Sequence, residues 1–121
     1  MSPINLLKQY IDATNTHNFE NVERLLHPKA VYWFTDKTCT GMEEIKKYFE
    51  TAWDTIKEEK YSAADVQWLV MENDSATCIY NYHYEGYFKG KFIKGSGRAT
   101  NVFVKDSEQN WEIIHEHLSS I

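Results

Sequence analysis

The residues best suited to chemistry lie in one segment near the end of the chain, residues 110–119. This segment predicts a β-strand, whose side chains point in turn to opposite faces. One face is expected to carry Trp111, Ile113, His115 and His117, and the other Glu112, Ile114, Glu116 and Leu118. Since both faces carry apolar residues, neither should be bare to water. We therefore expect a core on one side of the strand and a ligand cavity, a partner subunit or a metal on the other.

His115 and His117 are the residues whose spacing could bind a metal. Two residues apart on a strand, their Cα atoms would be about 6.6 Å apart on one face. His83 could add a third ligand, as zinc requires. Arg98 is expected on the same face, where its positive charge would repel a divalent cation. We therefore predict no metal and no other cofactor, and expect Trp111, Arg98 and the histidines to pack together in a structural role.

Length and composition exclude several classes of protein. The 121 residues suffice for one domain covering 1–121, and 42% hydrophobic residues suffice for its core. Eight Tyr and four Trp suit a core that encloses a partly polar cavity, because they join a large apolar surface to a polar tip. A net charge of -5 argues against nucleic-acid binding.

The cysteines and the lengths of the apolar segments indicate the cellular compartment in which the protein is expected. Cys39 and Cys78 are far apart and form no ligand motif. The N-terminus lacks a signal-peptide pattern, and no apolar run approaches the roughly 20 residues of a membrane span. We expect a cytoplasmic protein with free thiols and no membrane partner.

Hydrophobic periodicity predicts the elements that must position these residues. Ser2-Pro3 predicts the start of a first helix, Asn18 the start of a second that reaches Leu26 and stops at His27-Pro28, and 42–56 a third. Strands are expected at 30–35, 61–71, 76–88, 92–104 and 111–119, a turn at 36–41, and an exposed, charged helix end at 54–60. Helices followed by a four-strand antiparallel meander are typical of the α+β class.

Three stretches resemble a known superfamily in their order and spacing. They are Asn18-Phe19-Glu20 with Leu26-His27-Pro28-Lys29-Ala30-Val31, Gly41-Met42-Glu43-Glu44-Ile45 with Phe49-Glu50-Thr51-Ala52-Trp53, and Gly97-Arg98-Ala99-Thr100 with 111–119. Together they resemble the nuclear transport factor 2-like superfamily, and within it the SnoaL-like group and the association domain of calcium/calmodulin-dependent protein kinase. The resemblance implies a cone-shaped α+β domain, with three N-terminal helices packed on a strongly curved, mostly antiparallel sheet.

In such a fold the concave sheet face and the helices enclose a pocket. The resemblance to the association domain implies that Tyr80, Tyr82, Tyr84, Asn101 and Glu116 face it, and strand parity adds Ala99, Phe103, Ile114 and Leu118. The helices would add Tyr10, Phe49 and Trp53, and the first strand Tyr32 and Phe34. An aromatic cavity with few polar groups is typical of a small-molecule site. The alternative is that these aromatic residues simply fill the core.

The resemblance also limits the chemistry. Ketosteroid isomerases of this superfamily need a base, whose position matches Phe34, and a tyrosine donor, which matches Tyr10. Phenylalanine cannot take a proton, so that reaction is not expected. Glu116 could serve as a different base if burial raises its pKa, or could be a satisfied structural carboxylate. The arginines that bind carboxylates in the association domain match Tyr82, Asn101 and Leu118, so we predict a neutral or aromatic ligand rather than an anion.

The opposite, convex face of the sheet is the usual dimer contact of SnoaL-like proteins. His83, Arg98, Trp111, His115 and His117 are predicted to form it, in a two-fold homodimer that Trp111→Asp would break. The sequence thus predicts a small-molecule-binding protein, of the isomerase, cyclase or dehydratase type if it is an enzyme. The alternative is a homo-oligomeric association module without catalysis.

Overall fold

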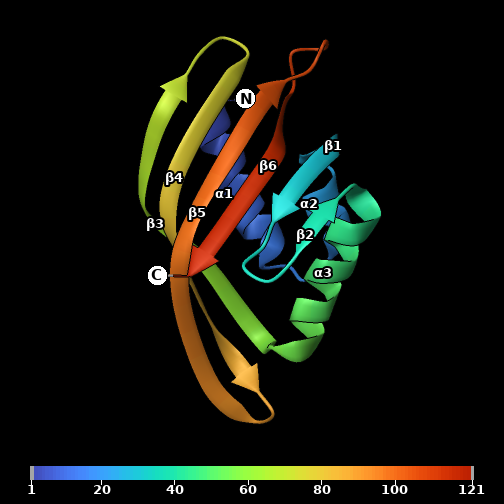
Figure 1. Ribbon diagram of the computed structural model, residues 1–121, viewed down its shortest axis with the longest axis vertical. Helices are drawn as coiled ribbons and strands as arrows, with labels where there is room; N and C mark the ends of the chain where they lie inside the picture. Colours follow the sequence, from blue (N-terminus) through green and yellow to red (C-terminus); the bar gives the residue numbers. More distant parts are fainter. Residues whose placement is uncertain (1, 121) are drawn as a thin grey trace.

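Four long strands joined as an antiparallel meander form most of the structure (Figure 1). This computed structural model describes residues 2–120. Its elements are α1 (Pro3–Thr14), α2 (Phe19–Glu23), β1 (Leu26–Trp33), β2 (Thr38–Thr40), α3 (Met42–Thr55), β3 (Lys57–Met71), β4 (Ser75–Phe88), β5 (Lys91–Lys105) and β6 (Trp111–Ser120). The strands form one curled, open sheet in the order β2-β1-β6-β5-β4-β3. β1 and β6 run parallel and the other neighbours antiparallel, so the predicted α+β class is confirmed.

Helix α1 begins as predicted and is tied to the sheet. The Ser2 hydroxyl accepts a hydrogen bond from the Asn5 backbone N–H at 3.2 Å, and Pro3 fits the first turn, where no N–H donor is needed. At the other end, Asn15 exchanges two hydrogen bonds with the backbone of Tyr61 in β3, at 2.8 and 2.7 Å. These contacts fix the helix, and with it Tyr10, against the concave face of the sheet.

The first strand differs from its prediction. Helix α2 ends at Glu23, and β1 already includes Leu26, which was expected in the helix. Leu26 pairs with Ile113 of β6, and both side chains are fully buried, so burial in the core outweighs the helical pattern. Pro28 cannot donate to the ladder, and the register between β1 and β6 shifts around it. The predicted turn at 36–41 contains the short strand β2.

A β-bulge in β6 changes which residues share a face. Val102 pairs with His115 but Phe103 pairs with Ile113, so Ile114 is an extra residue. Ile113 is therefore buried in the core on the concave side, as Glu116 is, and Ile114 does not take the concave position that parity predicted. The prediction that Trp111 and Ile113 share a face with His115 and His117 is wrong.

Trp111 instead lies on the concave side at the end of β6. It pairs with Lys105, packs against the core, and has the Lys105 ammonium 5.2 Å from its ring centroid. On the convex side its place is taken by Trp33 of β1, whose ring lies 5.2 Å from that of His115 and 5.4 Å from that of His117. The convex surface therefore keeps a tryptophan, supplied by a different strand.

Two glycines of β5 make room for tyrosine rings on the concave face. Gly97 pairs with Tyr82 and Gly95 with Tyr84. A Cβ atom at Gly97 would clash with the Tyr82 ring and with the Ser119 carbonyl, and one at Gly95 would lie 2.5 Å from the Tyr84 hydroxyl. The Gly95-Ser96-Gly97 segment thus lets both rings lie close over β5.

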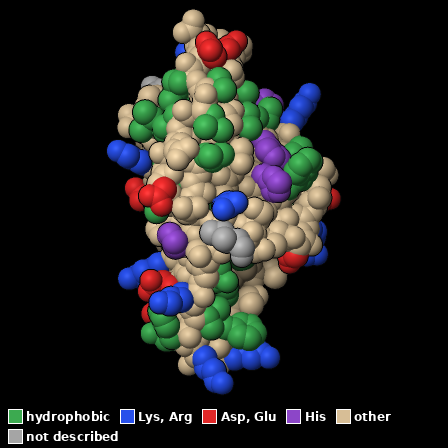
Figure 2. Space-filling model, turned by 60° about the vertical axis from the view of Figure 1, so that its left-hand side comes forward, with side chains coloured by type: hydrophobic (Ala, Val, Ile, Leu, Met, Phe, Trp, Pro, Cys, Tyr) green, Lys and Arg blue, Asp and Glu red, His purple; other side chains and the backbone are tan. Residues whose placement is uncertain are grey.

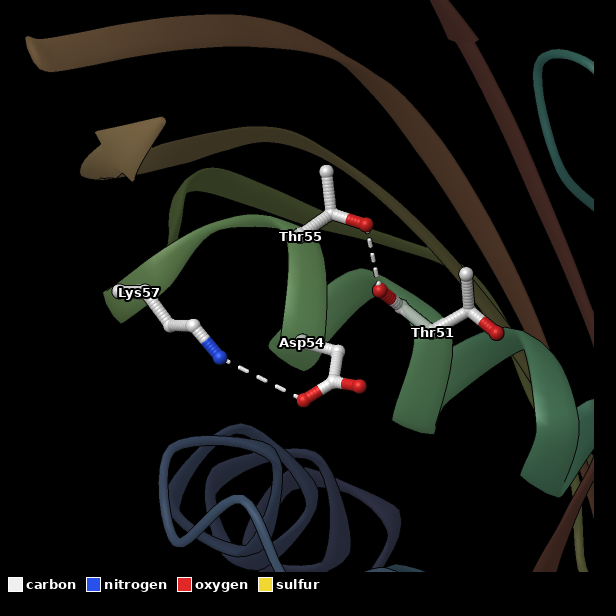
Figure 3. A network of polar contacts seen from close by, with 4 residues as sticks. All are labelled: Thr51, Asp54, Thr55 and Lys57. Carbon is white, nitrogen blue, oxygen red and sulfur yellow. Dashed lines mark hydrogen bonds and ion pairs between the residues drawn. The ribbon is translucent and has the colours of Figure 1, made fainter. Parts of the chain in front are cut away.

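Helix α3 buries the predicted stripe of Ile45, Phe49 and Trp53. Its C-terminal end is held by exposed polar contacts (Figure 3). The Thr55 hydroxyl donates to the Thr51 carbonyl at 2.7 Å, and Lys57 pairs with Asp54 at 3.4 Å. Such an exposed ion pair adds little stability, so the packing of Trp53 is the stronger constraint on this end of the helix.

The predicted free thiols are confirmed: Cys39 and Cys78 are both buried and unbridged. Burial raises the pKa of the Cys78 thiol to about 12. Among residues 2–120, no helix has the length and apolar character needed to cross a membrane.

Candidate functional site

A cavity of about 460 Å³ lies between α1, α3 and the concave face of the sheet. Eight of the residues predicted to face the pocket line it: Tyr10, Phe34, Phe49, Trp53, Tyr82, Tyr84, Glu116 and Leu118. Six others do not. Tyr32, Tyr80 and Asn101 are buried behind the wall, Ala99 and Phe103 lie in the core, where Phe103 packs against Trp68 with ring centroids 5.2 Å apart, and Ile114 is displaced by the bulge. The cavity is of the size that holds small organic ligands.

Glu116 is the buried charged group of this cavity, with only 3% of its surface exposed. Its Oε1 atom accepts two hydrogen bonds, from the Tyr10 hydroxyl at 2.9 Å and from the Asn101 amide at 3.1 Å. Tyr80 is also near the carboxyl, but it donates its single hydroxyl proton to Asn101 Oδ1 at 2.6 Å. Within residues 2–120 the Oε2 atom receives no hydrogen bond, which leaves it available to a ligand.

The residues behind the wall hold Glu116 in place. The Tyr32 hydroxyl donates to the Tyr10 hydroxyl at 2.9 Å, and Tyr80 orients Asn101. Burial, followed by the charge of Glu116, raises the pKa of Tyr10 and Tyr80 well above the usual value, so both hydroxyls stay protonated. Tyr32, Tyr80 and Asn101 thus support the site without lining the cavity.

Burial raises the pKa of Glu116 from 4.5 to about 7, against the opposing effect of the hydrogen bonds from Asn101 and Tyr10. Near neutral pH the carboxyl therefore exists in both its protonated and its ionised form. A group poised in this way can both give and take a proton, which is what general acid–base catalysis requires.

A second carboxyl, Glu59, was missed in the sequence. It lines the cavity near the start of β3, and burial raises its pKa to about 7. The charged segment 54–60 had predicted an exposed helix end, but β3 begins at Lys57. The register between β3 and β4 shifts between Lys57 and Lys60, where Glu58 has a positive φ of 53°. A single sequence gives no sign of such an irregularity, so parity could not have placed Glu59.

Aromatic contacts and an acidic group form the rest of the lining. Tyr61 stacks on Tyr82 with centroids 5.7 Å apart, and its buried hydroxyl forms no hydrogen bond within residues 2–120. Phe34 stacks on Tyr48 at 3.6 Å, and the Tyr48 hydroxyl donates to Asp36 at 2.7 Å. This part of the lining therefore combines aromatic rings with polar groups.

The histidines lie outside this cavity, on the convex face. Strand register places His83, Arg98, His115 and His117 there, and Figure 2 shows histidine side chains beside hydrophobic ones. His115 Nδ1 lies 2.7 Å from the Val31 carbonyl, so this nitrogen carries the proton and donates it. No group of three or more His, Cys, Asp or Glu side chains within residues 2–120 is arranged to hold a metal ion.

A family model agrees with this geometry. The model described as a SnoaL-like domain matches residues 4–121, nearly the whole chain. The chain belongs to the SnoaL-like domain family. No curated protein matches its sequence.

Solved structures resemble this SnoaL-like domain closely. A Xanthomonas campestris protein named for the association domain of calcium/calmodulin-dependent protein kinase II is 26% identical, with a TM-score of 0.84 over 96% of this chain and 83% of that one. A nuclear transport factor 2-like protein from Salmonella enterica is 17% identical, with a TM-score of 0.87 over 96% and 86%. The association domain of the C. elegans kinase is 16% identical, with a TM-score of 0.78 over 97% and 92%. The predicted superfamily is confirmed, and the last two likenesses concern the fold alone.

Proposed function

We propose that this SnoaL-like domain binds a small, largely apolar molecule in the cavity and that Glu116 exchanges a proton with it. One observation supports this most strongly: a buried carboxyl lines an aromatic cavity with one oxygen held by two donors and the other without a partner. A purely structural carboxylate in a buried residue would be expected to have both oxygens hydrogen-bonded within the protein.

The arrangement favours a reaction that begins with proton transfer, as in isomerases, cyclases and dehydratases. Glu116 Oε2 is the atom that would accept the proton, because Oε1 is occupied. Tyr10 donates its proton to Glu116 and is therefore a positioning residue rather than a donor to the ligand. Phe34 lines the cavity and cannot act as a base, so the proposed chemistry is not that of a standard ketosteroid isomerase.

Blocking the cavity tests the binding proposal. Ala52 lies in the lining between Phe49 and Trp53, and Ala52→Trp would fill part of the space. In a thermal-shift screen of neutral aromatic and polyketide-like compounds, we expect at least one to raise the Tm of the wild type by about 2 °C or more and to have no effect on Ala52→Trp. Lys47→Trp adds the same side chain on the exposed face of α3 and should keep the response. Stabilisation of none of the proteins, or of all three equally, would contradict the proposal.

A second function, self-association, is favoured by the convex face. Trp33 is 48% exposed beside His115 and His117, and an exposed tryptophan on a sheet face is typical of a protein contact. Two of the similar structures are named as association domains. We propose that this face joins two copies of the chain, with Trp33 in the role predicted for Trp111.

Trp33→Asp is expected to convert the dimer to a monomer. Each copy would place one negative charge in the contact, and the substitution leaves the core unaltered. Light scattering after size exclusion should give twice the 14.3 kDa chain mass for the wild type and once that mass for the variant. Leu69→Asp, which adds a charge at another exposed apolar residue, of the edge strand β3, serves as the control. A monomeric wild type, or a Trp33→Asp variant that remains dimeric, would refute this contact.

A further inference from the structure

The charges around the cavity are all of one sign. Asp36, Glu59 and Glu116 line it, and none of the described lining residues is lysine, arginine or histidine. His17 is not among the lining residues; it stacks on the Trp53 ring at 5.4 Å and is hydrogen-bonded to the backbone carbonyl of Glu59 at 2.8 Å. The cavity thus has three carboxyls and no cation among its described residues.

The walls between these carboxyls are aromatic. Phe49 and Trp53 of α3 meet edge to face with centroids 5.5 Å apart, and the stacked pair of Tyr61 and Tyr82 belongs to the sheet side. The face of an aromatic ring attracts a cation through its quadrupole, most strongly for tryptophan and at a site shielded from water. A cavity with aromatic walls and carboxyl groups is suited to binding an ammonium group.

Two polar atoms of the lining also lack hydrogen-bond partners. The buried Tyr61 hydroxyl has none within residues 2–120. The Oε2 atom of Glu116, a residue that is 3% exposed, receives no hydrogen bond in the same range. An ammonium ligand would give Oε2 a positively charged partner, and its charge would favour the ionised form of the carboxyl. A neutral hydrocarbon would leave both atoms unsatisfied.

We propose that the ligand of this cavity is a cation, an amine or quaternary ammonium group attached to an apolar body. The inference rests on the proposed small-molecule function and narrows it. The sequence had predicted a neutral ligand, because the missing arginines argue against an anion. The three carboxyls that line the cavity together favour a cation instead.

Three compounds of nearly the same shape test the charge of the ligand. They are (3-hydroxybenzyl)trimethylammonium, its uncharged analogue 3-neopentylphenol, and the anion 3-hydroxybenzylsulfonate. Calorimetric titration at pH 8, above the pKa of both Glu116 and Glu59, should show the ammonium compound binding at least about tenfold more tightly than the phenol. The sulfonate should not bind.

Charge-neutral variants then assign the preference to the cavity. Glu116→Gln should reduce the affinity ratio, the dissociation constant of the phenol divided by that of the ammonium compound, to about threefold or less. Glu59→Gln should reduce this ratio to a smaller extent. Glu50→Gln removes the same charge from the exposed surface of α3, outside the lining, and should leave the ratio unchanged. Because Glu59 is partly exposed and lies outside the hydrogen-bond network of Glu116, its variant is an independent test of the same preference.

The outcomes separate this inference from the proposed function. If the phenol binds as tightly as the ammonium compound, or if the ratio is the same in all three variants, the cavity does not select a cation, while its proposed role in binding small molecules stands. If the ammonium compound binds Ala52→Trp as tightly as the wild type, it binds elsewhere and the inference fails. Absence of binding by all three compounds also overturns the inference, and the screen with Ala52→Trp then decides the proposed function independently.

Discussion

Glu116→Gln is expected to stabilise the protein at pH 8 by about 3 kcal/mol and to have little effect at pH 4.5. The folded-state pKa of Glu116, about 7, lies above the ordinary value of 4.5 that it takes when unfolded. Between these pH values the folded state binds more protons than the unfolded state, so the free energy of unfolding falls as the pH rises. The difference between 4.5 and about 7 corresponds to about 3 kcal/mol.

The amide substitution preserves the geometry that surrounds the carboxyl. Both hydrogen bonds to Glu116 end on Oε1, and a glutamine Oε1 can accept the same two bonds from Tyr10 and Asn101. The groups that face Glu116 are the hydroxyls of Tyr10, Tyr32, Tyr61 and Tyr80, which remain protonated in this range, so none compensates its charge. Glu59 titrates in the same window but is retained in both proteins, so its contribution cancels.

The measurement is urea unfolding of both proteins at several pH values from 4.5 to 8. The free energy of unfolding of the wild type should fall relative to that of Glu116→Gln as the pH rises from 4.5 through 7. Above pH 7 the difference between the two proteins should stay constant. Parallel curves across the whole range would show that Glu116 titrates normally and is not the poised group of the site. A carboxyl that lowers stability at neutral pH is the expected mark of a functional residue.

Gly97→Val is expected to lower the free energy of unfolding by about 3 kcal/mol and to abolish binding in the cavity. The new side chain would occupy the space of the Tyr82 ring and press on the Ser119 carbonyl of β6, which is backbone and cannot turn aside. Tyr82 would have to move into the cavity that it now lines. Stability and ligand response should therefore be lost together.

Lys94→Val provides the control, because Lys94 is exposed on the same strand. Its free energy of unfolding should stay within about 0.5 kcal/mol of the wild type. Urea unfolding, together with the thermal-shift response to the compounds that stabilise the wild type, measures both properties. A Gly97→Val protein of normal stability that still responds to ligand would show that Tyr82 does not depend on this close approach.

Much of the site could be predicted because its residues lie on regular elements. Helical spacing in 3–14 placed Tyr10 on the buried side of α1. The resemblance to the association domain placed Tyr82, Tyr84 and Glu116 toward the pocket, and the burial pattern of β4 keeps Tyr82 and Tyr84 on one face. The structure brings Tyr10 and Glu116, 106 positions apart, to hydrogen-bonding distance, as their predicted faces require. Regular periodicity transmits such information along a strand or helix for as long as it is unbroken.

Irregular backbone is where the predictions failed. The bulge at Ile114 moved Trp111 away from the histidines, and the register shift near Glu58 brought Glu59 to the cavity. Each is one extra or displaced residue, and a displacement of one residue reverses every face beyond it. With Trp111 on the concave side, the tryptophan beside the histidines on the convex surface is Trp33 of β1.

The sequence by itself determined the α+β class and the order of the elements, because these follow from local periodicity. Its resemblance to a known superfamily, together with its many aromatic residues, predicted the aromatic character of the cavity. Only the tertiary structure decided which carboxyls reach the cavity, which oxygen of Glu116 is left without a partner, and which tryptophan is exposed. Those properties depend on bulges, strand register and the hydrogen bonds between distant segments. Their energies arise from contacts that exist only in the folded chain.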